Sequence, residues 1–126
     1  MSEEGNDPVR VDFDALLRAN IERVFNERNA ARREAAIGEL YSASPILYEP
    51  VGIVRGRDGV TQAAGALLER FGSQFVLVPD GQALGHDGLG VLRWHAKGGP
   101  PGLNGMDIAE VIDGRIHRLW VMLQTS

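Results

Sequence analysis

The sequence predicts a single α+β domain in which three helices pack on one face of a strongly curved, mostly antiparallel sheet. Two observations carry this prediction. Apolar residues recur at helical spacing in the first part of the chain, and short β-rich runs separated by turn signals follow. A chain of 126 residues suits one hydrophobic core. We therefore expect a disordered tail over residues 1–10 and one domain over residues 11–126.

The helices are expected where apolar residues repeat every three or four positions. Asp12 is placed to cap the first helix, and a second, shorter helix is expected through Tyr41. Residues 42–45 should stop it, because proline disfavours helical geometry in the residue before it. Asp58 is placed to cap the third helix, which Gly72 ends. The apolar stripes are Phe13, Leu16, Leu17, Ile21, Val24 and Phe25, then Ala36, Ile37, Leu40 and Tyr41, then Val60, Ala63, Ala64, Leu67, Leu68 and Phe71.

The remaining segments are expected to be strands. Residues 46–51 indicate a short strand whose Pro50 cannot donate to a ladder, which favours a sheet edge or a strand end. Asp113-Gly114 is a dipeptide typical of a tight hairpin turn, so the closing segment reads as a hairpin. The other predicted strands are 75–78, resumed at 82–85 after a bulge or turn signal, and 89–97, which a flexible loop separates from the hairpin.

Alternation along the first strand of the hairpin puts Met106, Ile108 and Glu110 on one face and Asp107 and Ala109 on the other. Glu110 therefore lies in an otherwise apolar row. An unpaired buried charge is costly, so such a carboxylate either becomes neutral or finds a partner. We keep three interpretations: an acid inside a cavity, an ion pair with Arg93 or Arg118, or an outer sheet face that contacts a second subunit.

Composition and charge narrow the class of protein. A net charge of -4 makes nucleic acid and anionic membranes poor partners. The absence of cysteine excludes thiolate chemistry, the three histidines are scattered, and no dinucleotide fingerprint precedes a helix. We therefore expect no metal and no cofactor. No secretory signal or apolar run of about 18 residues is present, so we expect a cytoplasmic protein.

The order of these segments resembles a known superfamily. Two helices, the strand Tyr48-Glu-Pro-Val-Gly52, the run Gly56-Arg-Asp-Gly-Val60 leading a helix, and antiparallel strands ending in Asp113-Gly-Arg-Ile-His-Arg-Leu-Trp120 resemble the nuclear transport factor 2-like superfamily. The narrower resemblance is to the SnoaL-like polyketide cyclases and ketosteroid isomerase. It covers nearly the whole chain after about Val11 and implies a cone-shaped cavity between helices and sheet. It also implies a homodimer through the outer sheet face.

The resemblance suggests two catalytic residues. Glu49 falls where ketosteroid isomerase has an acid followed by proline, the general base that moves a proton between carbons. Glu110 falls where that enzyme has a protonated acid that donates to the enolate oxygen. The isomerase also has a tyrosine in its first helix, which is absent here, and its two acids are aspartates. Steroid isomerisation itself is therefore not expected, and the SnoaL-like cyclases are the closer comparison.

These residues predict a protein that binds a small apolar ligand, with or without turnover. As an enzyme it would be an isomerase or cyclase that moves a proton next to a carbonyl group. One alternative is a non-enzymatic ligand-binding or dimerisation module, and another is an epoxide-hydrolase-like activity using an acid and an arginine in contact. The candidate ligand-contacting residues are Tyr41, Tyr48, Trp94, His95, Met106 and Leu119.

Overall fold

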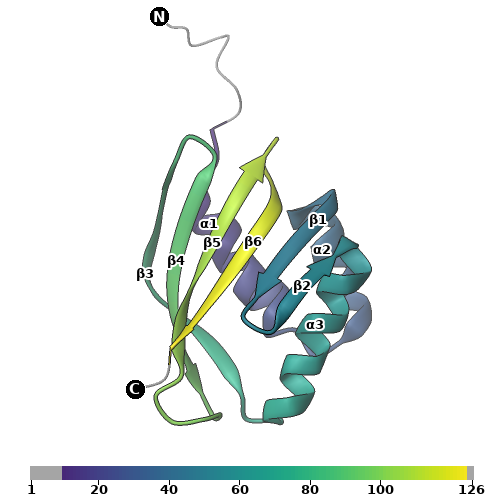
Figure 1. The fold of residues 1–126 in the computed structure, drawn as a ribbon, viewed down its shortest axis with the longest axis vertical. Helices are drawn as coiled ribbons and strands as arrows, with labels where there is room; N and C mark the ends of the chain where they lie inside the picture. The colour runs from purple at the N-terminus through teal and green to yellow at the C-terminus, as the bar shows by residue number, and fades with distance from the viewer. Residues whose placement is uncertain (1–9, 125–126) are drawn as a thin grey trace, which may run out of the picture.

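A computed structural model describes residues 10–124 and confirms the predicted α+β class (Figure 1). The predicted tail over residues 1–10 lies outside the described residues except for Arg10. In chain order the elements are α1 (Phe13–Asn20), the π-helical turn η2 (Ile21–Phe25), α2 (Ala30–Leu40), β1 (Tyr41–Glu49), β2 (Gly52–Arg55), α3 (Gly56–Phe71), β3 (Val76–His86), β4 (Leu89–Lys97), β5 (Asn104–Ile112) and β6 (Arg115–Gln124).

The six strands form one sheet in the order β2-β1-β6-β5-β4-β3. Every neighbouring pair is antiparallel except β1 and β6, which run parallel. The helices lie along one face of this sheet (Figure 1). The core forms between that inner face and the helices, with side chains such as Leu17, Leu47, Leu92 and Leu119 almost fully buried. The outer face is not covered by any described element.

The predicted tight turn at Asp113 and a second tight turn at Asp87 have the geometry that their sequences favour. Asp113 and Gly114 have φ values of 52° and 77°, and Asp87 and Gly88 have φ values of 50° and 83°. Two consecutive residues with positive φ are the mark of the hairpin turn whose twist matches that of the flanking strands. The turn at Asp113 sets the pairing of β5 with β6 next to it, and a register shift follows between Glu110 and Val111.

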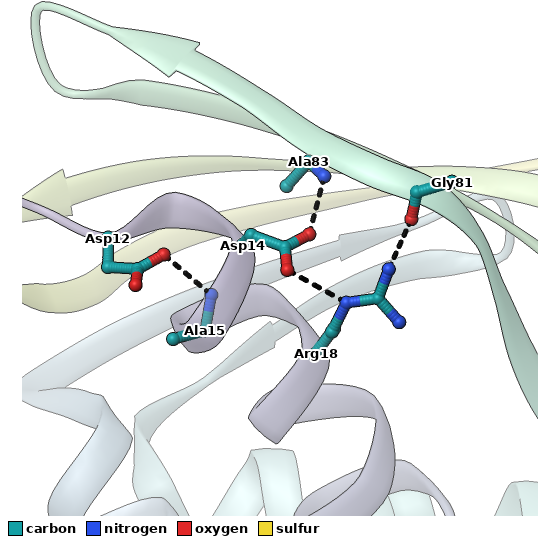
Figure 2. Close-up of polar contacts among 6 residues, drawn as sticks. All are labelled: Asp12, Asp14, Ala15, Arg18, Gly81 and Ala83. Carbon is teal, nitrogen blue, oxygen red and sulfur yellow. Dashed lines mark hydrogen bonds and ion pairs between the residues drawn. The ribbon is translucent and has the colours of Figure 1, made fainter.

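The start of α1 is anchored as the sequence predicts (Figure 2). The Asp12 carboxylate accepts a hydrogen bond from the Ala15 amide at 2.9 Å, which confirms it as the N-cap. Asp14 accepts from the Ala83 amide at 2.7 Å and from Arg18 Nε at 2.9 Å, and Arg18 also donates to the Gly81 carbonyl. The Ala83 amide and then the Arg18 guanidinium lower the pKa of Asp14. These contacts hold α1 at the bulge of β3, where the pairing with β4 shifts register.

Two predicted boundaries are wrong. Asp58 does not cap α3: the N-cap is Arg55, and the helix follows directly from β2 through Gly56, whose φ of 83° suits glycine. Asp58 lies within the first turn, where a carboxylate still favours the helix dipole. Tyr41 does not end the second helix, since its backbone is already extended and begins β1. Local spacing missed this change because the pairing of Tyr41 with Ile116 is a long-range contact.

The first strand is longer than the sequence indicates. Strand β1 begins at Tyr41 and continues through Pro45 to Glu49. Its pairing with β6 shifts register between Tyr41 and Ile46. A proline is compatible with a strand at such an irregularity, because no ladder hydrogen bond is needed there. Residues 52–55, for which no strand was predicted, pair with the end of β1 as an edge strand. The turn between β1 and β2 leaves Glu49 at the end of its strand.

Among the helices in residues 10–124, none combines the length and the apolar character that crossing a lipid bilayer requires.

Candidate functional site

A cavity of about 310 Å³ lies between the inner face of the sheet, α3 and the loop that follows β4. We call it the sheet pocket. Most of its wall is apolar and aromatic, which is typical of sites for small organic ligands. Its polar side chains are two acids, one arginine and one tryptophan. The lining residues are Phe25, Glu49, Pro50, Val51, Leu67, Arg70, Phe71, Phe75, Leu77, Trp94, Pro100, Leu103, Asp107, Val121 and Leu123.

Asp107 is the buried acid of the sheet pocket. It lies on the inner face of β5 and is only 4% exposed. Burial raises the pKa of this carboxyl to about 7, and the hydrogen bond from Trp94 opposes the rise. An acid with such a pKa is present in both protonated and ionised forms near neutral pH. It can therefore donate a hydrogen bond to a ligand or accept a proton from one.

Trp94 orients this acid. Its Nε1 donates to Asp107 Oδ1 at 3.0 Å, and the indole is almost fully buried. The two residues come from neighbouring strands, on which Trp94 faces Gly105 and Asp107 faces Leu92. Within the described part of the chain, Asp107 Oδ2 has no hydrogen-bond partner. Since Oδ1 is engaged by the indole, Oδ2 is the oxygen left for a ligand.

A second buried polar pair, Tyr41 and Asn20, lies close enough to Asp107 to feel its charge. The Tyr41 hydroxyl donates to Asn20 Oδ1 at 2.6 Å, and both residues are fully buried. Burial and then the negative charge of Asp107 raise the pKa of Tyr41, while the bond to Asn20 lowers it. Asn20 Nδ2 is the one side-chain nitrogen or oxygen among residues 10–124 that is wholly shielded from solvent and also lacks a hydrogen-bond partner. The inner end of the site therefore holds a compact polar cluster beneath an apolar wall.

Glu49 and Arg70 supply the other charges of the sheet pocket. Glu49 is half-buried at the end of β1, and this burial raises the pKa of its carboxyl. Arg70 extends from the last turn of α3, with its guanidinium 5.2 Å from the centre of the Phe71 ring. Because Val51 beside Glu49 is 90% exposed, this part of the wall is the mouth. Glu49 thus stands near solvent and Asp107 deep in the pocket.

The predicted pairing of Glu49 with Glu110 is corrected by the structure. Glu110 lies on the outer face of β5, opposite Leu89 and Arg118, and does not line the sheet pocket. Its carboxylate is 3.5 Å from Arg118 Nε, the ion pair that we had kept as an alternative. The alternation along β5 was predicted correctly, but the inner row is the one that carries Asp107. The second acid of the site is therefore Asp107.

The other predicted ligand-contacting residues are separated by the sheet. Trp94 lines the sheet pocket, whereas Tyr41 and Leu119 are fully buried in the core and do not line it. The remaining three are on the outer face: Tyr48 stacks on Trp120 with ring centroids 4.8 Å apart, His95 Nδ1 is 2.7 Å from Asp80 Oδ1, and Met106 pairs with Arg93 and Met122.

Asp107 was missed because the family resemblance pointed to Glu110, which lies in the other row of the same strand. A signal for the opposite choice is present in the sequence. The row of Asp107 also contains Gly105 and Ala109, and small residues in a strand mark a close approach of other groups. In the structure the Trp94 ring fills the space that a Cβ on residue 105 would take, and Trp94 Nε1 donates a hydrogen bond to Asp107.

This packing makes Gly105→Ala destabilising by about 1–3 kcal/mol, as expected for overpacking of a filled site. A Cβ at position 105 would lie 2.1 Å from the Met122 carbonyl oxygen and 2.6 Å from the Trp94 ring. Urea unfolding measures the change. The matched control is Gly52→Ala, whose Cβ would meet nothing within 4 Å. Equal stabilities of the two variants would show that Trp94 does not pack as described.

In residues 10–124, no three histidine, aspartate or glutamate side chains come together in a group able to hold a metal ion.

Comparison with known proteins identifies the fold. No protein-family model and no curated protein matches the sequence. Among solved structures, a presumed isomerase of the SnoaL-like family from Agrobacterium tumefaciens superposes with a TM-score of 0.79 at 19% identity, over 87% of this chain and 95% of that one. A presumed ketosteroid isomerase from Kribbella flavida gives 0.71 at 17% identity, over 91% and 79%. A presumed polyketide cyclase from Sinorhizobium meliloti gives 0.68 at 14%, over 86% and 94%.

Other similar structures are described as NTF2-like. The chain therefore has the nuclear transport factor 2-like fold, as the sequence predicted. At these identities the likeness extends to the fold, and any reaction has to be argued from the residues of the site.

Proposed function

We propose that the protein binds a small, mainly apolar, carbonyl-bearing molecule in the sheet pocket and moves a proton next to the carbonyl, as an isomerase or a cyclase does. The observation that carries this proposal is the pair of acids in an apolar pocket, one deep and oriented by Trp94 and one at the mouth. Burial raises the pKa of both Asp107 and Glu49, which brings them closer to neutrality, where acid-base catalysis works best.

The two acids divide the work by their positions. Protonated Asp107 donates through Oδ2 to the ligand carbonyl oxygen, and this bond strengthens as negative charge develops on that oxygen. Glu49, as the carboxylate, takes the proton from the carbon next to the carbonyl and returns it to another carbon. The apolar wall excludes water that would otherwise compete for both groups. Asp107 thus takes the role for which the sequence suggested Glu110.

The proposal is tested without knowing the natural substrate by following hydrogen exchange in ketones. Small apolar ketones are incubated with the full chain in D₂O, and deuterium at the carbon next to the carbonyl is measured by mass spectrometry. Proton abstraction predicts incorporation above the buffer rate for ketones that fit a cavity of about 310 Å³. Ketones that bind tightly but never exchange would refute catalysis and support the non-enzymatic binding module.

The epoxide-hydrolase alternative receives less support. It requires an acid and an arginine in contact within the cavity, and the contact between Arg118 and Glu110 lies on the outer face. Arg70 lines the sheet pocket, but within residues 10–124 it forms no ion pair with an acid of that pocket. Proton transfer next to a carbonyl needs only the two acids that line the sheet pocket, without an arginine in contact with either of them.

We also propose that the protein is a homodimer through the outer face of the sheet. An antiparallel sheet exposed on one side normally presents polar residues there. Here the outer face carries large apolar side chains, including Ile53 and Met122, which are 58% and 48% exposed, and the stacked pair Tyr48 and Trp120. A second copy of the same face would bury these residues through a two-fold contact.

Met122→Glu is therefore expected to convert the dimer to a monomer, because two carboxylates would be buried without partners at the contact. Light scattering behind size-exclusion chromatography measures the mass. The control is Ala35→Glu, the same charge on an exposed position of α2. A wild-type chain that is monomeric at all concentrations would contradict the proposal.

A further inference from the structure

Arg33 is a buried cation that the site described above does not use. It extends from α2 and is only 8% exposed. Its Nε donates to Thr61 Oγ1 at 3.0 Å and its Nη1 donates to the Glu27 carbonyl oxygen at 2.7 Å. Within residues 10–124, Nη2 has no hydrogen-bond acceptor and no carboxylate forms an ion pair with this guanidinium. Arg33 therefore combines burial, full charge and one unused edge.

One candidate counter-charge, Glu27, also has other partners. The Glu27 carboxylate accepts a hydrogen bond from the Asn29 amide at 3.0 Å and lies 3.5 Å from Arg32 Nε. Arg33 hydrogen-bonds to the main-chain oxygen of Glu27. After the hydrogen bond from Asn29, the charge of Arg33 is one of the causes that lower the pKa of the Glu27 carboxyl. A largely buried guanidinium that forms no direct ion pair is costly. An anion supplied from solution would offset that cost.

A groove beside Arg33 has room for such an anion. This α2–α3 groove has a volume of about 480 Å³ and shares no lining residue with the sheet pocket. Leu67, Arg70 and Phe71 of α3 face the sheet pocket, so the groove uses a different side of the same helix. Its lining residues include Arg28, Arg33, Thr61, Gln62, Gly65 and Glu69.

Gly65 leaves room for the Arg33 guanidinium to lie against α3. A Cβ at this position would lie 2.9 Å from Arg33 Nη2, closer than a real Cβ approaches such an atom. Arg28 adds a second guanidinium, which is held by the Gly72 and Phe75 carbonyl oxygens at 2.9 and 2.7 Å. The groove thus presents two fixed cations, and Glu69 is its one acidic lining residue.

We propose that the α2–α3 groove is a binding site for a small oxyanion, a phosphate or carboxylate group, held on Arg33 Nη2 with Arg28 beside it. Guanidinium groups suit both anions because their parallel N–H bonds match the spacing of two oxygens. The groove lies outside the sheet pocket, so this proposal stands or falls independently of the proposed proton transfer.

The test uses inorganic phosphate and acetate as separate probes. The full chain, labelled with ¹⁵N-arginine, is titrated at constant ionic strength with chloride as the reference salt, and the side-chain Nε–H signals are followed by NMR. The expected result is a saturable shift of the Arg33 signal, which Arg33→Gln identifies by its loss. Saturation by phosphate alone, by acetate alone or by both shows which oxyanion is recognised. A shift that only follows total salt would overturn the proposal.

Matched variants separate the groove from general surface charge. Gly65→Ala is expected to abolish saturation, whereas Gly38→Ala in α2, whose Cβ meets nothing within 4 Å, is expected to leave it intact. Gln62→Glu adds a negative charge and should weaken anion binding about threefold. Glu69→Gln removes one and should tighten binding about threefold, the size expected for partly screened charges. Gln62 and Glu69 are exposed, so Gln62→Glu and Glu69→Gln are expected to fold normally. These two variants therefore test the groove even if Gly65→Ala does not fold. Unchanged affinity in Gln62→Glu and Glu69→Gln would place the anion elsewhere and refute the assignment.

Discussion

Asp107→Asn is expected to make the protein more stable at pH 8 by up to about 4 kcal/mol and to change its stability little at pH 4. The side chain is almost fully buried, and its pKa rises from 3.8 to about 7 on folding. The folded state therefore holds a proton that the unfolded state has lost. Folding is favoured at low pH, and stability falls as the pH rises from about 4 to about 7. Asparagine removes this dependence because it cannot ionise.

The measurement is urea unfolding of both proteins at half-unit steps from pH 4 to pH 8. Asparagine keeps the shape of the side chain and an oxygen that accepts from Trp94 Nε1, so the packing is preserved. The matched control is Asp113→Asn, the same change in an exposed turn with a φ of 52°, which asparagine tolerates. A constant difference between Asp107→Asn and the wild type across this pH range would show that Asp107 is not desolvated.

Glu49→Gln is expected to lower the rate of deuterium incorporation into a responsive ketone by about 10²–10⁴-fold, the usual contribution of a general base. Glutamine matches the size of the glutamate but cannot accept the proton. Binding of the ketone should change less than the rate, because the apolar wall of the sheet pocket remains. The measurement is the initial exchange rate under saturating ketone, followed by mass spectrometry.

The control for this change is Glu110→Gln. Glu110 lies on the outer face beside Arg118, so its loss should leave the exchange rate within about twofold of the wild type, since an exposed ion pair contributes little. Asp107→Asn should lower the rate as well, because the amide is a weaker donor to a developing oxyanion than a carboxylic acid. A Glu110→Gln variant that lost activity while Glu49→Gln kept it would overturn the assignment of the two acids.

Much of the local structure was predictable because it depends on neighbours in sequence. The Asp12 cap and the Asp113-Gly114 turn are fixed by short-range hydrogen bonds and backbone preferences. The start of β1 at Tyr41 and the edge strand over residues 52–55 were not, because strand pairing decides both. The same contrast applies to the candidate site: Glu49, predicted from its place before Pro50, lines the sheet pocket, whereas Asp107, which also lines it, was not predicted.

Arg33 is a charged residue whose spacing in the sequence places it on a buried helix face, and a search for apolar residues alone does not detect it. It lies three and four positions before Ala36 and Ile37, on the buried stripe of α2. A charged residue on such a stripe requires partners inside the protein. Those partners, Thr61 and the Glu27 carbonyl, come from other segments, so their identity depends on how the helices pack.

The sequence by itself determined the α+β class, the alternation of side chains along β5 and the closing hairpin, since period and turn chemistry are properties of the local chain. Only the tertiary structure decided which face of β5 points inward. Both rows of that strand contain apolar residues and one acid, so burial in the isolated chain favours neither. The helices cover the row with Asp107, Ala109 and Val111, and the site follows from that packing.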